Sequence, residues 1–293
     1  MRVVVIGARG FVGSHLVDQL GHLNHVVPTA RSQVDLSDPK SLRDGLCPGD
    51  VVINASGYAN ATDTTEEGEK RFQAANVDGV RNLAQVASDV GVAHLVHISS
   101  VAAMGRWHQE GVTEQMQKPV ASPYSASKLE GERVLAEFTG DLPITILRPT
   151  SVFGEGRGLA RTLCGVISRR IVPLPAGGGA KIPFTYMGNV AHAVELCLAN
   201  PQCFGKTFII GDEQSYRLRE VVLALAKELD VEIKIIPVPI WSANMGVRLL
   251  ERLATMRGSP PLLDRGRLDT MTNSVSYSIA SFQRATEYQP PYS

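Results

Sequence analysis

The sequence predicts an α/β fold, with a doubly wound parallel sheet followed by a smaller α/β lobe. Three observations support this prediction. An apolar, β-branched run at residues 3–6 enters a glycine-rich turn and then a helical pattern. Strand and helix patterns alternate to about residue 150, as expected for a parallel sheet covered by helices. Glycines and prolines become more frequent after Glu155, which indicates a second lobe.

The elements of the first part can be placed in chain order. Strands are expected at residues 3–6, 25–31, 50–54, 93–98 and 144–147, and helices at residues 11–20, 66–75 and 77–90. Pro28 should end the second strand early or lie where its missing N–H is not needed.

The turn after the first strand has glycine at every third position, at Gly7, Gly10 and Gly13. Gly7 can adopt a backbone conformation closed to other residues, Gly10 leaves room for a pyrophosphate, and Gly13 lets the helix pack closely on the strand. The phosphates would meet the helix N-terminus at Phe11 and Val12, where free N–H groups and the helix dipole favour negative charge. This turn therefore predicts a dinucleotide site.

The end of the second strand suggests which dinucleotide is bound. An acidic residue there would bind the 2′-hydroxyl of NAD, but the chain has Arg31 and Ser32. A guanidinium suits a 2′-phosphate, and Arg9 is a second candidate for the same group, so NADP(H) is favoured over NAD(H). Asp35 is a candidate to contact the adenine, although a turn or helix cap explains it nearly as well.

Small residues follow the third strand, at Ala55, Ser56 and Gly57, and leave room for a ligand at the strand end. The strand at 93–98 ends in Ser99 and Ser100. Beyond it, Ser122 and Pro123 can begin a helix that places Tyr124 and Lys128 one turn apart on one face.

Tyr124 and Lys128 form a candidate acid–base pair. An ammonium one turn away would lower the pKa of the phenol from its usual value near 10. Ser100 could then hold a substrate oxygen while Tyr124 exchanges a proton and a nicotinamide exchanges a hydride. By itself, the Tyr-x-x-x-Lys spacing is more typical of an exposed amphipathic helix, but together with the glycine turn and the serine pair at a strand end it favours a catalytic role.

Together these motifs resemble the extended short-chain dehydrogenase/reductase superfamily, in its epimerase/dehydratase and 3β-hydroxysteroid-dehydrogenase-like branch. The matching residues are Gly7-x-x-Gly10-x-x-Gly13, Asp35-Leu36, Asn54-Ala55-Ser56-Gly57, Asn76-Val77-x-Gly79, Ser99-Ser100, Tyr124-x-x-x-Lys128, Arg148–Gly154 and Phe184–Ala191. The resemblance implies a Rossmann-like fold in which Ser100, Tyr124 and Lys128 are catalytic. It implies cofactor contacts from Gly7, Arg9, Gly10, Phe11, Val12, Gly13, Arg31, Ser32, Asp35, Leu36, Ala55, Ser56, Gly57, Asn76, Ser99, Tyr124, Lys128, Pro149 and Val152.

The chain departs from the family pattern at Met104-Gly105, Gly188-Asn189 and Ser151, where sugar-nucleotide enzymes often carry Tyr-Gly, an acidic pair and Asn. These departures weaken the prediction of any particular sugar-nucleotide reaction. They leave the prediction of redox chemistry intact.

The resemblance also divides the chain into residues 1–154, a dinucleotide-binding domain, and residues 155–293, mainly a substrate lobe, with about 184–212 returning to the first domain. A loop is expected at 177–179, strands at 205–211 and 233–238, and a helix at 218–229. The apolar stretch 241–253 could line an apolar pocket, or be a core or dimer-contact helix. Arg169, Arg170 and Lys181 could meet a diphosphate or lie on the surface. The tail at 275–291 resembles the segment before a final family helix, and that helix is not apparent.

Composition narrows the function classes. Lys plus Arg and Asp plus Glu both number 29, so net charge indicates neither a nucleic-acid partner nor a membrane surface. Cys47, Cys164, Cys197 and Cys203 lack metal-ligand spacing and are expected to be free thiols, without a bound metal. No signal peptide is apparent, so a cytoplasmic location is the default expectation.

The sequence thus predicts an NADP(H)-dependent oxidoreductase that interconverts a secondary alcohol and a ketone on a small-molecule substrate. Within this class of enzyme, two more specific functions remain open. One is a nucleotide-sugar 4-epimerase or 4-ketoreductase, and the other is a steroid-dehydrogenase-like reductase of an apolar ketone. A non-catalytic NADP(H)-binding redox sensor is the competing class, although such sensors usually lack the tyrosine or lysine. Related enzymes are often dimers, so a homodimer is also compatible with the sequence.

Overall fold

A computed structural model describes residues 1–23, 25–154, 157–257 and 263–292. Its centre is a six-stranded sheet in the order β11-β5-β4-β3-β1-β2, and every neighbouring pair is parallel. The strands are β1 (Val3–Ile6), β2 (Val26–Thr29), β3 (Val51–Asn54), β4 (His94–Ile98), β5 (Ile144–Pro149) and β11 (Lys206–Ile210). This architecture confirms the predicted α/β fold class.

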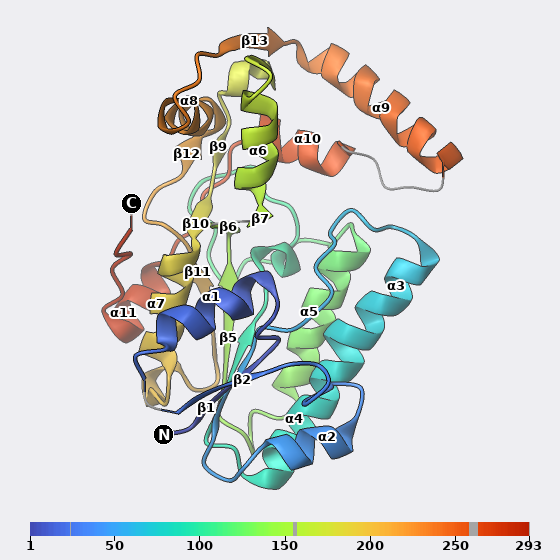
Figure 1. The fold of residues 1–293 in the computed structure, drawn as a ribbon. Helices are drawn as coiled ribbons and strands as arrows, with labels where there is room; N and C mark the ends of the chain where they lie inside the picture. Colours follow the sequence, from blue (N-terminus) through green and yellow to red (C-terminus); the bar gives the residue numbers. More distant parts are fainter. Residues whose placement is uncertain (24, 155–156, 258–262, 293) are drawn as a thin grey trace.

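The central strands are buried because helices cover both faces of the sheet (Figure 1). One face carries α1 (Phe11–Leu20), α7 (Met187–Cys197) and α11 (Ala280–Thr286), and the other carries α2 (Pro39–Gly45), α4 (Gly79–Val90) and α5 (Pro123–Ala136). Successive strand residues point to opposite faces. Val3 and Val5 therefore pack in the first layer, and Val4 and Ile6 in the second.

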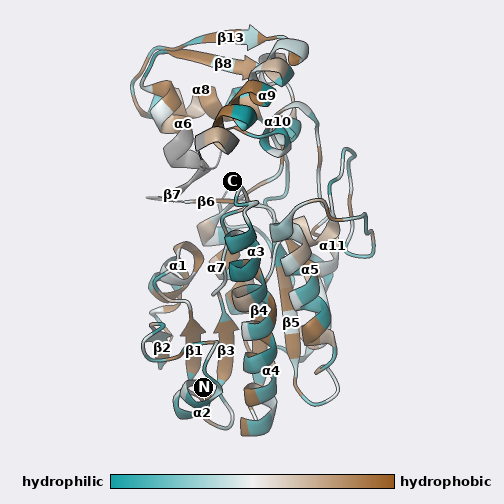
Figure 2. Ribbon diagram, turned by 90° about the vertical axis from the view of Figure 1, so that its right-hand side faces the viewer, coloured by the Kyte–Doolittle hydropathy of each residue, from teal (hydrophilic) through white to brown (hydrophobic). Residues whose placement is uncertain are grey.

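Hydropathy follows the same layering. In Figure 2 the central strands are coloured hydrophobic, while the helices in front of them carry hydrophilic segments. Pro28 lies in β2, which is the last strand in the order of the sheet, and an edge position tolerates a residue without an N–H. The Thr29 hydroxyl makes an additional hydrogen bond to the neighbouring strand, donating to the carbonyl of Val5 at 3.0 Å.

The helices predicted at 66–75 and 77–90 are joined without a loop. Helix α3 (Glu66–Gln73) continues through a π-helical segment, Ala74–Asp78, into α4. π-Helical turns are rare in proteins overall, and those that occur are often found at functional sites. The turn lies at the position where the sequence pattern breaks, and it contains Asn76.

The second lobe packs around its own apolar cluster, which includes Ile167, Val172, Phe184 and Val222. Its strands are β6 (Ser151–Gly154), β7 (Arg157–Gly158), β8 (Ile171–Pro175), β9 (Lys181–Ile182), β10 (Phe184–Tyr186), β12 (Tyr216–Arg217) and β13 (Lys234–Val238). Its helices are α6 (Leu159–Ile167), α8 (Leu218–Glu228), α9 (Ile240–Arg257) and α10 (Arg265–Thr272). Figure 1 shows this lobe beyond the end of the sheet at which the strands β1, β3, β4 and β5 finish.

The tail contains a short helix that the sequence reading did not predict. In α11 the ring of Phe282 lies 5.1 Å from that of Phe208 on β11, so the helix completes the cover of the sheet edge. This helix lies within the tail segment itself, and the described residues after it, 287–292, form no further helix. Across the described part of the chain, none of the helices has both the length and the apolarity that crossing a membrane requires.

Candidate active site

The strand order reverses direction between β1 and β3, and ligands of open α/β sheets bind at the carboxyl ends of strands at such a point. The turn after β1 and the loop after β3 meet there. Gly7 has φ +83°, and a Cβ on it would lie 2.7 Å from the amide nitrogen of Ser56. The structure thus brings the glycine turn against the predicted Ala55–Gly57 loop.

The glycine turn fits a pyrophosphate. A Cβ on Gly13 would lie 2.1 Å from the carbonyl oxygen of Gly7, so only glycine allows α1 to approach the strand this closely. Gly10 occupies the N-cap position without a side chain that could cap the helix, and the first turn, which begins with Phe11 and Val12, carries no acidic residue. The amide groups of that turn therefore remain available to an anion.

The structure places Arg31 and Asp35 together beyond β2. The Arg31 Nε donates to Asp35 Oδ2 at 3.0 Å, and the Arg31 side chain is 85% exposed. Asp35 also accepts from the amide and hydroxyl of Ser37, and these hydrogen bonds, helped by Arg31, keep the pKa of its carboxyl below the usual value. Asp35 therefore acts as a turn residue, as the alternative interpretation expected. Ser32 is exposed nearby.

Asn76 connects the loop after β3 to α5. Its amide nitrogen donates to the carbonyl of Tyr58 at 3.0 Å and to the Ser127 hydroxyl at 2.9 Å, and its amide oxygen accepts from Tyr58 N at 2.9 Å. A Cβ on Gly57 would lie 3.6 Å from the Lys128 Nζ. The predicted contacts Gly57, Asn76 and Lys128 thus meet in one place. Leu36 lies against Gly79 beneath the same crevice, where its buried side chain contributes to the core.

Helix α5 begins as its sequence suggests. Ser122 caps it by accepting a hydrogen bond from the amide of Ser125 at 3.1 Å, and Pro123 occupies the first turn. Tyr124 follows in the same turn, close enough to Ser100, just after β4, for the Ser100 hydroxyl to influence its phenol. Lys128, one turn later, donates from Nζ to the carbonyl of Ile98 at 3.2 Å. The three predicted residues of the reacting group are therefore adjacent.

The pKa of Tyr124 moves in the opposite direction from the prediction. It is raised, because the phenol is buried, and the influence of the Ser100 hydroxyl only partly opposes this. The Phe72 ring, 5.9 Å from that of Tyr124, forms part of the apolar surroundings. Burial also lowers the pKa of Lys128 to about 8, although the nearby Glu132 carboxylate favours the charged form. Desolvation therefore outweighs the attraction that the spacing suggested.

A buried ion pair beneath these residues was not anticipated. Arg148 on β5 donates from Nε to Glu132 Oε1 at 3.0 Å and makes a second contact from Nη2 to Oε2. The hydroxyl of Ser99 donates to the same carboxylate, so this predicted cofactor residue is bound to the network through its side chain. Glu132 follows Lys128 by four residues, and extending the helical spacing by one turn would have found it.

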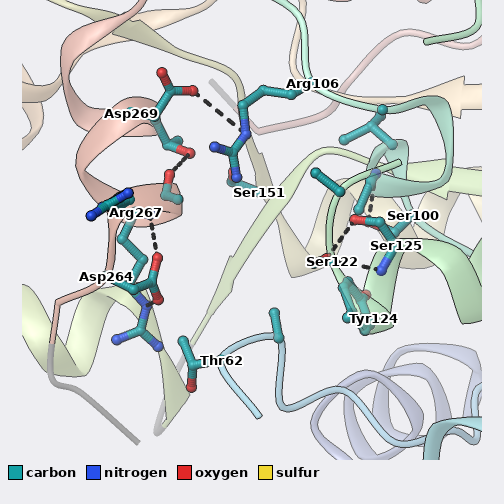
Figure 3. A pocket seen from close by; sticks show the side chains of 18 of the residues that line it. Thr62, Ser100, Arg106, Ser122, Tyr124, Ser125, Ser151, Asp264, Arg267 and Asp269 are labelled. Carbon is teal, nitrogen blue, oxygen red and sulfur yellow. Dashed lines mark hydrogen bonds and ion pairs between the residues drawn. The ribbon is translucent and has the colours of Figure 1, made fainter. Parts of the chain in front are cut away.

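A cleft of about 1040 Å³ opens beside Ser100 and Tyr124 and reaches the second lobe. Figure 3 shows Ser100 and Tyr124 on one side and Asp264, Arg267 and Asp269 of the α10 region on the other. Pro149 ends β5 and Val152 lies in β6, so both lie on the segment that supplies the cleft residues Thr150 and Ser151.

Charged residues line this cleft. Asp269 pairs with His108 at 2.8 Å and with Arg106 at 3.5 Å. Arg265 pairs with Glu251 at 3.2 Å, and Arg267 with Asp264 at 3.9 Å. No spacing rule connects Arg106 to residues some 160 positions later, and only a run of charges around 264–269 could have drawn attention to them.

The structure bears on two groups of residues for which the sequence left alternatives open. Arg169 and Arg170 are exposed away from it, and Lys181 pairs on the surface with Glu110 at 3.0 Å. The stretch 241–253 forms most of α9 but does not make an apolar pocket. Of α9, only Glu251 and Ala254 are among the described cleft residues, while Trp241 is 68% exposed.

Comparisons with known proteins agree with this geometry. The model of the family described as the NAD dependent epimerase/dehydratase family matches residues 3–211. UDP-glucose 4-epimerase of Vibrio cholerae is 27% identical, covering 99% of this chain and 90% of the relative. A 3beta-hydroxysteroid-dehydrogenase/decarboxylase of Arabidopsis thaliana is also 27% identical, covering 98% of this chain but 59% of the relative.

Solved structures share the fold. RMD from Pseudomonas aeruginosa, complexed with NADPH, has a TM-score of 0.78 at 21% identity, covering 100% of this chain and 95% of that one. MoeE5 in complex with UDP-glucuronic acid and NAD has a TM-score of 0.74 at 18% identity, covering 100% and 95%. The neighbours therefore include proteins bound to either nicotinamide cofactor.

Proposed function

Because the chain belongs to the NAD-dependent epimerase/dehydratase family, we propose that it interconverts a secondary alcohol and a ketone with NADP(H), using Ser100, Tyr124 and Lys128. The family membership confirms the resemblance found in the sequence, and the protein is an NAD(P)-dependent enzyme of the extended short-chain dehydrogenase/reductase type. The observation that carries the proposal is that Ser100 and Tyr124 lie on the same side of the cleft (Figure 3), with Lys128 one turn after Tyr124 on α5.

In this proposal a substrate carbonyl oxygen accepts hydrogen bonds from both hydroxyls. Burial raises the pKa of Tyr124, so its phenol is protonated at neutral pH and can donate a proton as the carbonyl carbon is reduced. Ser100 keeps its hydrogen bond to the developing alkoxide. In the oxidation direction, the alcohol returns its proton to Tyr124.

In this proposal Lys128 binds the cofactor and orients it together with the substrate. Its ammonium is fixed by the carbonyl of Ile98, between the loop at Gly57 and the foot of the cleft. A nicotinamide cofactor, when bound, supplies or accepts the hydride. The glycine turn at Gly7, Gly10 and Gly13 would hold its pyrophosphate, for which α1 offers free amides.

The preference for NADP(H) rests on Arg9 and Arg31. Arg31 is highly exposed, so its guanidinium is accessible to a 2′-phosphate. Its partner Asp35 uses one carboxylate oxygen for Ser37 and the other for Arg31, which leaves this carboxylate less available to a ribose 2′-hydroxyl. A bidentate guanidinium–phosphate contact would replace the exposed ion pair.

The charged cleft favours a polar, phosphorylated substrate over an apolar ketone. Arg106, Arg265 and Arg267 each have a carboxylate partner, but a guanidinium has five N–H donors and can bind a phosphate as well. A nucleotide-sugar 4-epimerase or 4-ketoreductase is therefore the second, finer candidate. The Vibrio cholerae relative is such an epimerase, and MoeE5 binds a UDP-sugar.

The test compares Tyr124→Phe with Tyr58→Phe. Tyr58 is a matched control because its ring packs on the other side of the shared neighbour Phe72, at 4.9 Å. NADPH consumption is measured with dTDP-4-keto sugars and cyclohexanone as candidate substrates, and epimerisation of UDP-sugars at C4, which consumes no cofactor overall, is measured as formation of the epimer. Loss of a general acid should slow turnover by about 10²–10⁴-fold in Tyr124→Phe, with NADPH affinity nearly unchanged.

Tyr58→Phe should keep most of the turnover, because its phenol contacts Asp63 and lies outside the described cleft wall. Full turnover in Tyr124→Phe would exclude the proposed acid. Turnover with cyclohexanone but with none of the sugar nucleotides would exclude the finer candidate and retain the oxidoreductase.

A further inference from the structure

Helix α9 turns an apolar face away from the protein. The face is a stripe of residues spaced three or four apart, hereafter the α9 stripe: Trp241, Met245, Leu249, Leu253 and Met256. Trp241 is 68% exposed, Met245 64% and Met256 83%. The opposite side of the helix is buried through Val247 and Ala254. Exposed apolar surface of this extent marks an interaction site.

The charges on α9 are asymmetric. Arg248 and Arg252 are exposed and lie beside the stripe at helical spacing. The helix has a single acidic residue, Glu251, which faces the cleft and pairs with Arg265 at 3.2 Å. The two charged side chains of α9 described beside the stripe, Arg248 and Arg252, are therefore both basic, although the charge of the whole chain is balanced.

The apolar and basic character continues into the ribbon before α9. Strand β13 pairs with β8, and Figure 1 shows it leading directly into α9 at the outer end of the second lobe. On this ribbon Ile171 is 54% and Ile236 41% exposed, with Arg170 and Lys234 exposed beside them. The ribbon thus shares the exposed apolar and basic residue types of α9.

A second copy of the chain fits this face poorly. In a two-fold dimer the same patch meets itself, so an antiparallel pairing about the middle of the stripe would bring Arg248 and Arg252 of both copies together. α9 offers no acidic side chain on that side to balance them. Like charges held close at an interface are destabilising.

We propose that the α9 stripe docks on the surface of a membrane that contains anionic lipids. A helix with a Trp-bearing apolar face and arginines at its border lies in the interface, where its apolar side chains enter the acyl boundary and its arginines meet lipid phosphates. The indole of Trp241 suits that interface because its ring is apolar and its N–H is polar. The occupant is a lipid surface, and the helix lies along it.

Intrinsic fluorescence tests this docking directly, because the chain has two tryptophans in different settings. Trp107 is buried and donates to the carbonyl of Met104 at 3.0 Å, whereas Trp241 is exposed. Vesicles of phosphatidylcholine with phosphatidylglycerol should shift the emission to the blue and float with the protein. Trp241→Phe should remove the shift but keep flotation, and phosphatidylcholine alone should bind far less.

Three variants sharpen the test. Met245→Glu with Leu249→Glu should abolish flotation, and Arg248→Gln with Arg252→Gln should weaken it about thirtyfold on anionic vesicles. Leu229→Glu is the control, since Leu229 is 46% exposed outside α9, and it should bind like the native protein. NADPH binding, measured in parallel, confirms that each variant is folded.

The proposal is overturned by any of three results. The first is a native protein that neither floats nor shifts its emission with anionic vesicles. The second is unchanged flotation of the Met245→Glu, Leu249→Glu variant. The third is a native dimer, seen by light scattering, that this variant converts to monomers without any vesicle binding, because a second copy would then be the occupant.

Discussion

Replacing Lys128 by Met should stabilise the protein at pH 7 while abolishing its hydride-transfer activity. Burial lowers the pKa of Lys128 from 10.5 to about 8. At about 1.4 kcal/mol per tenfold change in proton affinity, the charged form costs about 3 kcal/mol more in the fold than in the unfolded chain. Met has a similar length and no charge, so it removes this cost.

Part of the gain is lost with the hydrogen bond to the carbonyl of Ile98, a loss of about 1 kcal/mol. The net stabilisation should be about 2 kcal/mol, or roughly 4 °C in Tm for a chain of this size. The residue that we propose orients cofactor and substrate would thus lower stability, as residues at functional sites commonly do.

The pH dependence of stability tests the direction of this effect. Because the pKa of Lys128 is lower in the fold, the unfolded chain binds more protons between about pH 8 and 10.5, and the stability from this group rises over that range. The advantage of Lys128→Met should therefore be largest at pH 7 and shrink toward pH 10.

Urea unfolding followed by circular dichroism, without cofactor, measures the difference at each pH. Lys40→Met is the control, since Lys40 is 86% exposed in its pair with Asp44, and it should change stability by less than about 0.5 kcal/mol. A Lys128→Met protein that is less stable at pH 7, or a difference that does not vary with pH, would refute the reasoning.

Local patterns in the sequence predicted the local structure of the glycine turn and the start of α5. Helix α1 has the predicted bounds because the glycine turn fixes its start, and α5 begins at Pro123 because Ser122 caps it. The close approaches at Gly7 and Gly13 are likewise local, since each depends on a turn and the strand beside it. Signals of this kind act over one or two turns of chain, where spacing is informative.

The substrate side could not be predicted in the same way. Arg106 meets Asp269 only after the second lobe folds over the sheet, and no periodicity links positions so far apart. The prediction for the pKa of Tyr124 was wrong for a related reason. Spacing shows that Lys128 is near the phenol, but it does not show that the phenol is buried. The attraction between two charged groups can be inferred from their spacing in the sequence, whereas the desolvation of each group depends on all the side chains packed around it.

Helix α9 illustrates a third limit. Apolar residues occupy both sides of it, so the sequence left open whether residues 241–253 line a pocket, enter the core or meet a partner. The structure buries Val247 and Ala254 and leaves Trp241 exposed. Net charge gave no hint of the basic border, because a sum over the chain contains no information about where charges lie.

Two further substitutions test the two ends of the proposed site. Glu132→Gln leaves the buried Arg148 without its counter-charge and should lower the free energy of unfolding in urea by about 3 kcal/mol. The control Glu130→Gln breaks an exposed ion pair and should lower it by less than about 0.5 kcal/mol. Equally small effects of both substitutions would show that the buried pair contributes little. Arg9→Ala with Arg31→Ala should weaken NADPH binding about tenfold or more and leave NADH binding nearly unchanged, because only NADPH carries the 2′-phosphate that the guanidinium groups would contact. Nicotinamide fluorescence titration of both cofactors measures this, and equal losses would mean that these arginines do not read the 2′-phosphate.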